Sequence, residues 1–130
     1  MREAACSCGQ LRLEVEGDPV RVGVCHCLAC QRRSGAPFAQ QARFPRERVT
    51  ISGEARDYVR YSDEDGAPRT FSFCPECGST VYYRNHTEPG VIAIAVGAFA
   101  DPSFPPPQYS VWEERKHPWV TLPDGIERPN

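Results

Sequence analysis

Seven cysteines in three tight clusters constrain this chain more than any other feature of its sequence. They stand as C-x-C at Cys6 and Cys8, as C-x-C-x-x-C at Cys25, Cys27 and Cys30, and as C-x-x-C at Cys74 and Cys77. An odd number of cysteines at such short spacings does not suit a closed set of disulfides, and thiols that serve only as small apolar groups do not gather in this way. In a reducing compartment these spacings are typical of metal ligands, above all for zinc.

Length and charge limit the remaining possibilities. A chain of 130 residues has the length of one domain, so we expect a single zinc-binding domain over residues 1–130. The formal net charge is −2, without the basic patch that nucleic acid or an anionic membrane would require. No apolar run approaches the length of a membrane span, and the first ten residues lack the apolar core of a secretory signal. We therefore expect a cytoplasmic protein that binds neither membrane nor nucleic acid.

Short alternating segments predict a mostly β fold. Thirteen prolines and ten glycines divide the chain into short pieces. Apolar residues alternate with polar ones over 11–15 and 20–24, and further strands are expected at 38–44, 49–52, 58–61, 69–73, 81–83 and 109–112. The apolar run 91–96 predicts a central strand that is buried on both faces. Residues 28–33 form the best candidate for a short helical turn, which Gly35 would end.

The segment CPECG at 74–78 is the strongest zinc signal. Two cysteines with two residues between them fit one tetrahedral zinc ion, and the glycine that follows accepts a left-handed backbone at little cost. The segment CSCG at 6–9 has the same pattern and is the preferred partner, which would give a closed, structural site of Cys6, Cys8, Cys74 and Cys77. A rival arrangement pairs 74–78 with Cys25 and Cys27, and the spacing alone does not exclude it.

The preferred division leaves three cysteines, Cys25, Cys27 and Cys30, for a second zinc ion. Three thiolates and one vacant position are the arrangement of a reactive zinc site rather than a structural one. His26 stands between two of these residues. Because neighbouring side chains of a strand point to opposite sides, we expect its ring to turn away from the metal and to support the site or lie on the surface.

The order of these motifs resembles a known family. The segments CSCG, CHCLACQRRSG at 25–35 and CPECG, together with VGAFADPSFPPP and YSVWEERKHPWV in the last third, are similar to the glutathione-dependent formaldehyde-activating enzymes, which include centromere-protein-V-like proteins. The resemblance implies a β-tent (Mss4-like) fold of several short antiparallel sheets around two zinc ions. It implies that Cys6, Cys8, Cys74 and Cys77 hold the structural zinc, and that Cys25, Cys27 and Cys30 hold the second zinc.

The same resemblance implies an activity and its partners. The family joins a small thiol, glutathione, to a small aldehyde, formaldehyde, which is a carbon–sulfur lyase reaction in reverse. A free thiol is only slightly ionised at neutral pH, whereas a thiol bound to zinc is held as the reactive thiolate. A zinc ion would therefore suit this chemistry. Glutathione carries two carboxylates, so a guanidinium near the second zinc is expected to bind it, and Arg33 is the better candidate.

Two other classes of function remain open at this point. The same fold could serve as a non-enzymatic, zinc-stabilised binding or interaction module. In that case both zinc ions would be structural and equally inert. A nucleic-acid-binding zinc module is the weaker alternative, because the net charge is negative.

Overall fold

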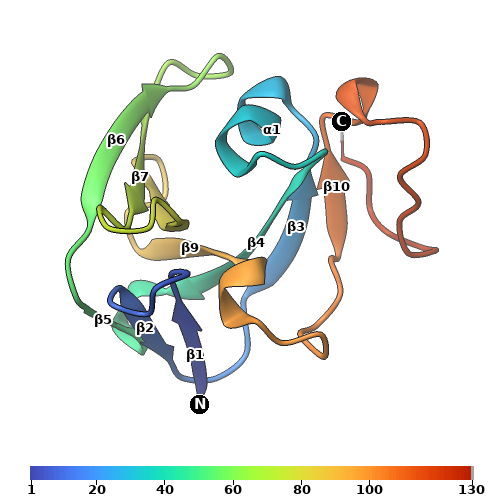
Figure 1. Cartoon of the computed structure of the whole chain (residues 1–130). Helices are drawn as coiled ribbons and strands as arrows, with labels where there is room; N and C mark the ends of the chain where they lie inside the picture. Colours follow the sequence, from blue (N-terminus) through green and yellow to red (C-terminus); the bar gives the residue numbers. More distant parts are fainter. Residues whose placement is uncertain (130) are drawn as a thin grey trace.

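The computed structural model describes residues 1–129 of the chain, and Figure 1 shows their path. The strands are β1 (Arg2–Ala5), β2 (Arg12–Val15), β3 (Arg21–Cys25), β4 (Ala39–Pro45), β5 (Val49–Ser52), β6 (Arg56–Tyr61), β7 (Pro68–Phe73), β8 (Thr80–Asn85), β9 (Val91–Ala95) and β10 (Tyr109–Val111). The helices are α1 (Leu28–Ser34) and three 3₁₀ turns, η1 (Arg46–Arg48), η2 (Val96–Phe99) and η3 (Glu113–Arg115). The predicted mostly β class is confirmed.

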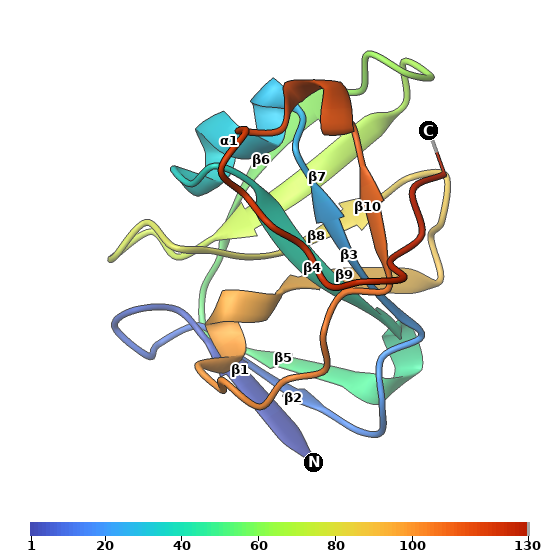
Figure 2. The ribbon, with the colours of Figure 1, turned by 90° about the vertical axis from the view of Figure 1, so that its right-hand side faces the viewer.

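The strands form two sheets. One has the order β1-β2-β5, and the other has the order β10-β3-β4-β9-β8-β7-β6. Every pair in them is antiparallel except β10 with β3, which is parallel. Figures 1 and 2 show α1 at the opposite end of the molecule from the three-stranded sheet. No helix within residues 1–129 has the length and apolar character needed to cross a membrane.

The predicted periodicities explain most of the strands. In β2, Leu13 and Val15 are buried whereas Arg12 and Glu14 are exposed, as the alternation indicates. The apolar strand β9 lies between β4 and β8, and its three middle residues are buried, so the predicted central strand is confirmed. The sequence analysis did not predict β1, because its residues Arg2–Ala5 lack an apolar alternation.

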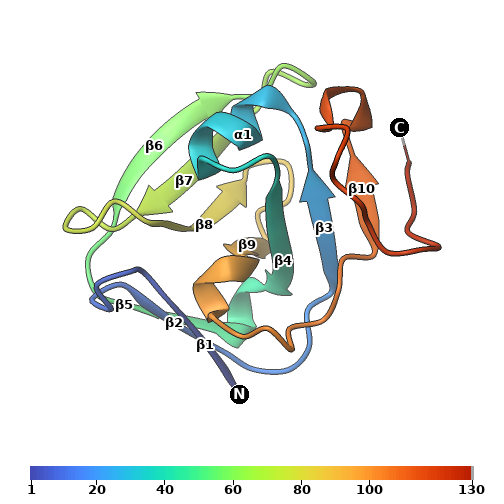
Figure 3. The same ribbon diagram turned by 45° about the vertical axis from the view of Figure 1, so that its right-hand side comes forward.

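Apolar side chains from both sheets meet in one core. Its buried members include Leu13 and Val15 from β2, Phe44 from β4 and Ile94 from β9, with Phe99 of η2 packed on Phe44 at a ring distance of 6.1 Å. Burial of such side chains supplies the main force for folding. The core therefore joins the three-stranded sheet to one face of the seven-stranded sheet (Figure 3).

The other face of the seven-stranded sheet is polar. Arg43 lies opposite Ala93, Ala93 opposite Tyr83, and Tyr83 opposite Phe71 across four adjacent strands. Residues that face each other across a ladder project to the same side. Ala39 and Arg43 are four positions apart in β4, so their side chains point to the same face of the sheet. Cys25 is paired with Ala39 and therefore belongs to this polar face as well. The register of the sheet thus places charged and hydroxyl groups beside a cysteine.

We expect Gly53→Ala to destabilise the protein by about 3 kcal/mol or more. Gly53 has a φ of 91°, and an added Cβ would overlap the carbonyl oxygen of Gln10. Gly66→Ala is the matched control, because Gly66 has a φ of 69° and open space around its Cβ position. The control measures the cost of the left-handed backbone alone, about 1 kcal/mol. Urea unfolding of both variants checks the difference, and equal losses would contradict the predicted overlap.

Candidate metal centres

The structure groups the seven cysteines into two sets. The sulfur atoms of Cys6, Cys8, Cys74 and Cys77, here called the quartet, all lie within 4.8 Å of one another. The sulfur atoms of Cys25, Cys27 and Cys30, here called the trio, do the same. All seven thiols are free. The sequence analysis preferred this division of the cysteines over the rival one, and the structure confirms that preference. Metal binding itself stays a prediction.

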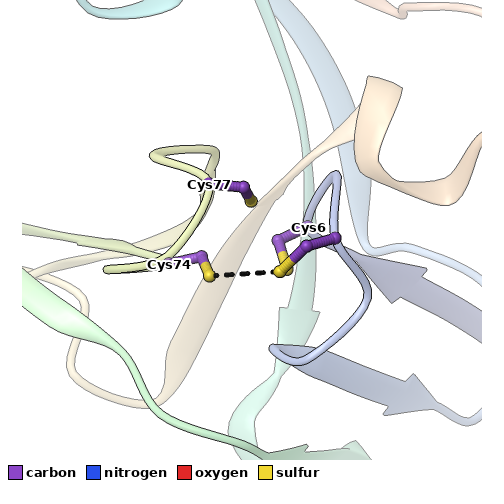
Figure 4. A group of neighbouring side chains, drawn as sticks. Cys6, Cys74 and Cys77 are labelled. Carbon is purple, nitrogen blue, oxygen red and sulfur yellow. Dashed lines mark hydrogen bonds between the residues drawn. The ribbon is translucent and has the colours of Figure 1, made fainter.

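Two similar turns hold the quartet. One follows β1 and the other follows β7, and in each the glycine after the second cysteine donates its N–H to the first cysteine's carbonyl, at 3.1 Å for Gly9 and 2.8 Å for Gly78. Both glycines have a φ near 80° (85° and 80°). The Sγ–Sγ distances are 3.6 Å for Cys6–Cys8 and 3.7 Å for Cys8–Cys74. Figure 4 shows the sulfur atoms of Cys6, Cys74 and Cys77 turned toward one another.

Hydrogen bonds to sulfur support the charged form of Cys74 and Cys77, whereas burial and the neighbouring thiols raise the pKa of Cys8 to about 11. The Leu11 N–H donates to Cys6 Sγ at 3.3 Å, and the Gln10 side-chain amide donates to Cys74 Sγ at 3.0 Å. The Ser79 side chain and backbone lower the pKa of Cys77 to about 5. Hydrogen bonds to a thiolate favour ionisation, and a metal ion binds the ionised form. The donor set of the quartet therefore fits a closed tetrahedral metal such as zinc.

The end of β3 and the start of α1 position the trio. Cys25 is the last residue of β3, Cys27 is the N-cap of α1, and Cys30 lies in its first turn. Cys27 Sγ accepts the backbone N–H of Cys30 at 3.3 Å, which is the usual bond of an N-cap. The predicted helical turn is confirmed, and it ends at Gly35, whose N–H donates to the carbonyl of Gln31.

The protonation of the trio also fits a cation. Hydrogen bonds from Cys25 and Cys30 lower the pKa of Cys27 to about 2. Hydrogen bonding to Cys27 and Cys30, together with burial, raises the pKa of Cys25. One thiolate is thus stabilised by protons that its neighbours retain. A divalent metal ion would replace these protons and allow all three sulfur atoms to ionise.

His26 stays outside the trio. Its ring is fully buried, and Nε2 lies 2.9 Å from the hydroxyl oxygen of Ser110 on β10. No fourth Cys, His, Asp or Glu among residues 1–129 joins the trio within 4.8 Å. The ring therefore turns away from the cysteines as expected, although it is buried rather than on the surface. It ties the loop between β3 and α1 to β10.

A pocket of about 790 Å³ lies over the trio. Its lining includes all three cysteines and six arginines, Arg21, Arg33, Arg43, Arg60, Arg69 and Arg115, against the four carboxylates of Asp63, Glu64, Glu88 and Glu127. We call it the first pocket. Its volume is in the range of sites for small organic ligands, and its charge favours an anionic one.

Three of these arginines, Arg33, Arg60 and Arg115, form no ion pair with a carboxylate within residues 1–129, and two of them, Arg33 and Arg60, lie over the ring of Phe71. Arg33 lies with Nη1 3.9 Å from Cys30 Sγ, and its guanidinium sits over the rings of Phe71 at 4.5 Å and Tyr83 at 5.5 Å. Arg60 sits over the same Phe71 ring at 6.0 Å. Within residues 1–129 neither guanidinium forms an ion pair. Arg33, which was singled out from the sequence, therefore points at the trio and is available to bind an anion.

The sequence analysis missed the polar network at the other side of the first pocket. Arg43 is buried and donates to the hydroxyl oxygens of Tyr83, at 3.0 Å, and Tyr109, while Glu88 lies 4.0 Å from its Nε. Desolvation raises the pKa of Tyr83. The sequence offered only the alternation of Gln41 and Arg43 with the apolar Ala42 and Phe44, which equally fits a strand with one solvent-exposed face.

Comparisons with known proteins agree with this arrangement. A sequence model of the family "Glutathione-dependent formaldehyde-activating enzyme" matches residues 1–115. A crystal structure of a Rhodobacter sphaeroides protein is similar in fold, with a TM-score of 0.57 and 20% sequence identity. The similarity covers 74% of this chain and 85% of the other chain. The cysteine sets, the mostly β fold and the match over residues 1–115 show that this chain belongs to the glutathione-dependent formaldehyde-activating enzyme family.

Proposed function

We propose that this protein joins a small thiol such as glutathione to a small aldehyde such as formaldehyde. The reaction is that of a carbon–sulfur lyase in reverse. The observation that carries the proposal is a trio of convergent thiols, without a fourth protein ligand among residues 1–129, at the wall of a pocket rich in arginine. Seven free thiols suit a reducing compartment, so we place the protein in the cytoplasm.

We further propose two zinc ions in each chain. The quartet would hold one as a closed site, and the trio would hold the other with one position left for a guest. When bound at the trio, zinc supplies a Lewis-acidic position at which a thiol loses its proton at neutral pH. All seven donors are sulfur, which suits a borderline-soft ion such as zinc.

The residues of the chain would bind and orient the reactants. Arg33 and Arg60 offer two guanidinium groups without carboxylate partners, and glutathione has two carboxylates. Arg33 also lies close to Cys30, so it would stabilise negative charge beside the trio. In the reaction the thiol gives up its proton, its sulfur forms a bond to the aldehyde carbon as the C=O double bond becomes a single bond, and the carbonyl oxygen takes up the proton, so nothing is oxidised or reduced.

The test uses the full chain made in zinc-replete cells. Metal analysis should find two zinc ions in each chain. Exchange NMR with ¹³C-formaldehyde and glutathione should then find faster formation of the S-hydroxymethyl adduct than in buffer alone. The same protein stripped of metal is the control. One zinc ion in each chain, or an unchanged rate of adduct formation, would refute the proposal.

Arg33→Met is expected to weaken the use of glutathione but not of 2-mercaptoethanol. Loss of a charge-assisted pair to a carboxylate should raise the KM for glutathione by roughly ten-fold. The thiol without a carboxylate should keep its KM, because it has no group to bind there. Arg32→Met is the matched control, since Arg32 is exposed and lies outside the first pocket. An equal change for both thiols would show that Arg33 does not bind the carboxylate.

A further inference from the structure

A second pocket of about 750 Å³ lies next to the first and differs from it in chemistry. Its lining has no Asp or Glu among the described residues, and Arg33 is its one charged side chain. The remaining walls are small or neutral, with alanines, glycines and the hydroxyl groups of Ser7, Ser34, Ser79 and Thr80. Because Arg33 points at the trio in the first pocket, the walls that are left to the second pocket carry no Asp, Glu, Lys or Arg and suit a neutral polar molecule.

Three side chains separate the two pockets. Arg33, Gln41 and Tyr83 line both of them, and they are the residues that the two linings share. Arg33 comes from α1, Gln41 from β4 and Tyr83 from β8. A molecule in the second pocket would therefore reach the trio by passing these three residues. It could do so even when another molecule occupies the first pocket.

Gln41 is the member of this wall that lacks a hydrogen-bond partner. Its side chain is 5% exposed, and Oε1 is buried without a donor among the described residues. Gln41 lies two residues from Ala39, whose partner across the ladder is Cys25. The two positions share one face of β4 and are about 7 Å apart along it. A buried amide oxygen without a donor indicates a place for a ligand that donates a hydrogen bond.

We propose that the second pocket binds the carbonyl reactant in its hydrated form, with Gln41 as the acceptor of a hydroxyl group. This inference rests on the proposed function. Formaldehyde in water is present largely as its gem-diol, which carries two O–H donors where the free carbonyl carries none. Gln41 Oε1 can accept one of these donors, and the hydroxyl groups around the pocket can bind the other oxygen.

The division of the pockets then gives each reactant its own approach. The thiol with its carboxylates would enter the first pocket, where the arginines gather, and the neutral hydrate would enter the second. The balanced reaction forms one C–S bond and breaks one C–O bond of the gem-diol. The hydrate loses one water molecule to give the aldehyde, the thiol then adds to its carbon, and the thiol proton goes to the carbonyl oxygen, so no further reactant is needed.

The experiment follows binding of the stable hydrate of trifluoroacetaldehyde by ¹⁹F NMR to the zinc-loaded full chain. Gly97 lines the second pocket and has open space around its Cβ position, so Gly97→Trp should fill the pocket without a backbone clash. Gly90→Trp is the matched control, because Gly90 also has open space but lines neither pocket. We expect Gly97→Trp to weaken hydrate binding by roughly ten-fold or more, and Gly90→Trp to leave it unchanged.

Two substitutions at Gln41 test the acceptor separately. Gln41→Met keeps the length of the side chain and removes the oxygen, and we expect it to weaken hydrate binding about five-fold. Gln41→Glu retains an acceptor oxygen and should bind more tightly than Gln41→Met. A merely structural role would not separate the two variants. Equal loss in both, or unchanged binding in Gly97→Trp, would overturn the assignment.

Glutathione distinguishes this inference from the proposed function. If the pockets are separate, saturating S-methylglutathione, which has the carboxylates of glutathione but no thiol to react with the hydrate, leaves hydrate binding unchanged, whereas competition between them would overturn the inference. If the wild-type protein binds the hydrate at Gln41 but does not accelerate adduct formation, the proposed reaction fails while the binding site stands.

Discussion

Cys77→Ser is expected to leave the metal-loaded protein largely unfolded. Cys77 is exposed and makes no contribution to the apolar core, so the loss would come from the quartet rather than from packing. The quartet joins Cys8 to Cys74 across 66 residues and fixes the loop after β1 against the end of β7. A structural zinc contributes about 10–16 kcal/mol to folding, whereas the net stability of a domain is only about 5–15 kcal/mol. The folding free energy that is lost when the site is weakened should therefore be larger than the net stability of the domain.

Circular dichroism, urea unfolding and zinc content measure this effect together. The far-ultraviolet spectrum of Cys77→Ser should resemble that of the wild-type protein after treatment with a strong chelator. The wild-type protein with zinc is the reference. A Cys77→Ser protein with the wild-type urea midpoint would show that the fold does not depend on the quartet.

Cys30→Ser should keep the fold and lose the reaction. Cys30 lies in the first turn of α1, and a serine hydroxyl is close in size to its thiol, so we expect a stability loss of about 1–2 kcal/mol. The trio would retain two thiolates, and adduct formation should fall by about a hundred-fold or more. The zinc content should fall from two ions toward one in each chain.

The comparison of the two serine variants separates the enzyme from a purely structural zinc protein. If Cys30→Ser unfolds the chain as severely as Cys77→Ser, the trio is a second structural site and the proposed reaction is wrong. If Cys30→Ser is folded, holds one zinc ion and is inactive, the two sets have the different roles that the proposed function assigns to them.

Local sequence predicted the parts of the site that are close in the chain. Cys25 is the last residue of a strand, Cys27 is the N-cap of the next helix, and Cys30 lies in the first turn of that helix. Local periodicity and helix capping specify these positions. The glycines after Cys8 and Cys77 permit the left-handed backbone that each turn requires. These features depend on neighbours within a few residues, so they can be read without the fold.

The chemistry of the pockets was not predictable in the same way. In the sequence, Arg43 is a single charged residue in a strand, and Tyr109 is 66 residues away from it. The parallel pairing of β10 with β3 brings the two side chains into contact. Arg33 of α1 and Arg60 of β6 meet over the ring of Phe71 of β7, so three elements that are separate in the chain come together there. Such contacts depend on strand order and register, which single-sequence patterns do not specify.

The sequence by itself determined the mostly β class, the short helix after the third strand and the seven cysteines as candidate metal ligands, because periodicity and local spacing carry that information. Tertiary structure decided between the two divisions of the cysteines that the sequence left open, and it alone decided how the arginines gather over the trio and that Gln41 is buried without a donor. The physical reason is that these properties belong to a sheet of seven strands in a particular order. Burial and charge at one position depend on side chains from strands that are distant in the chain.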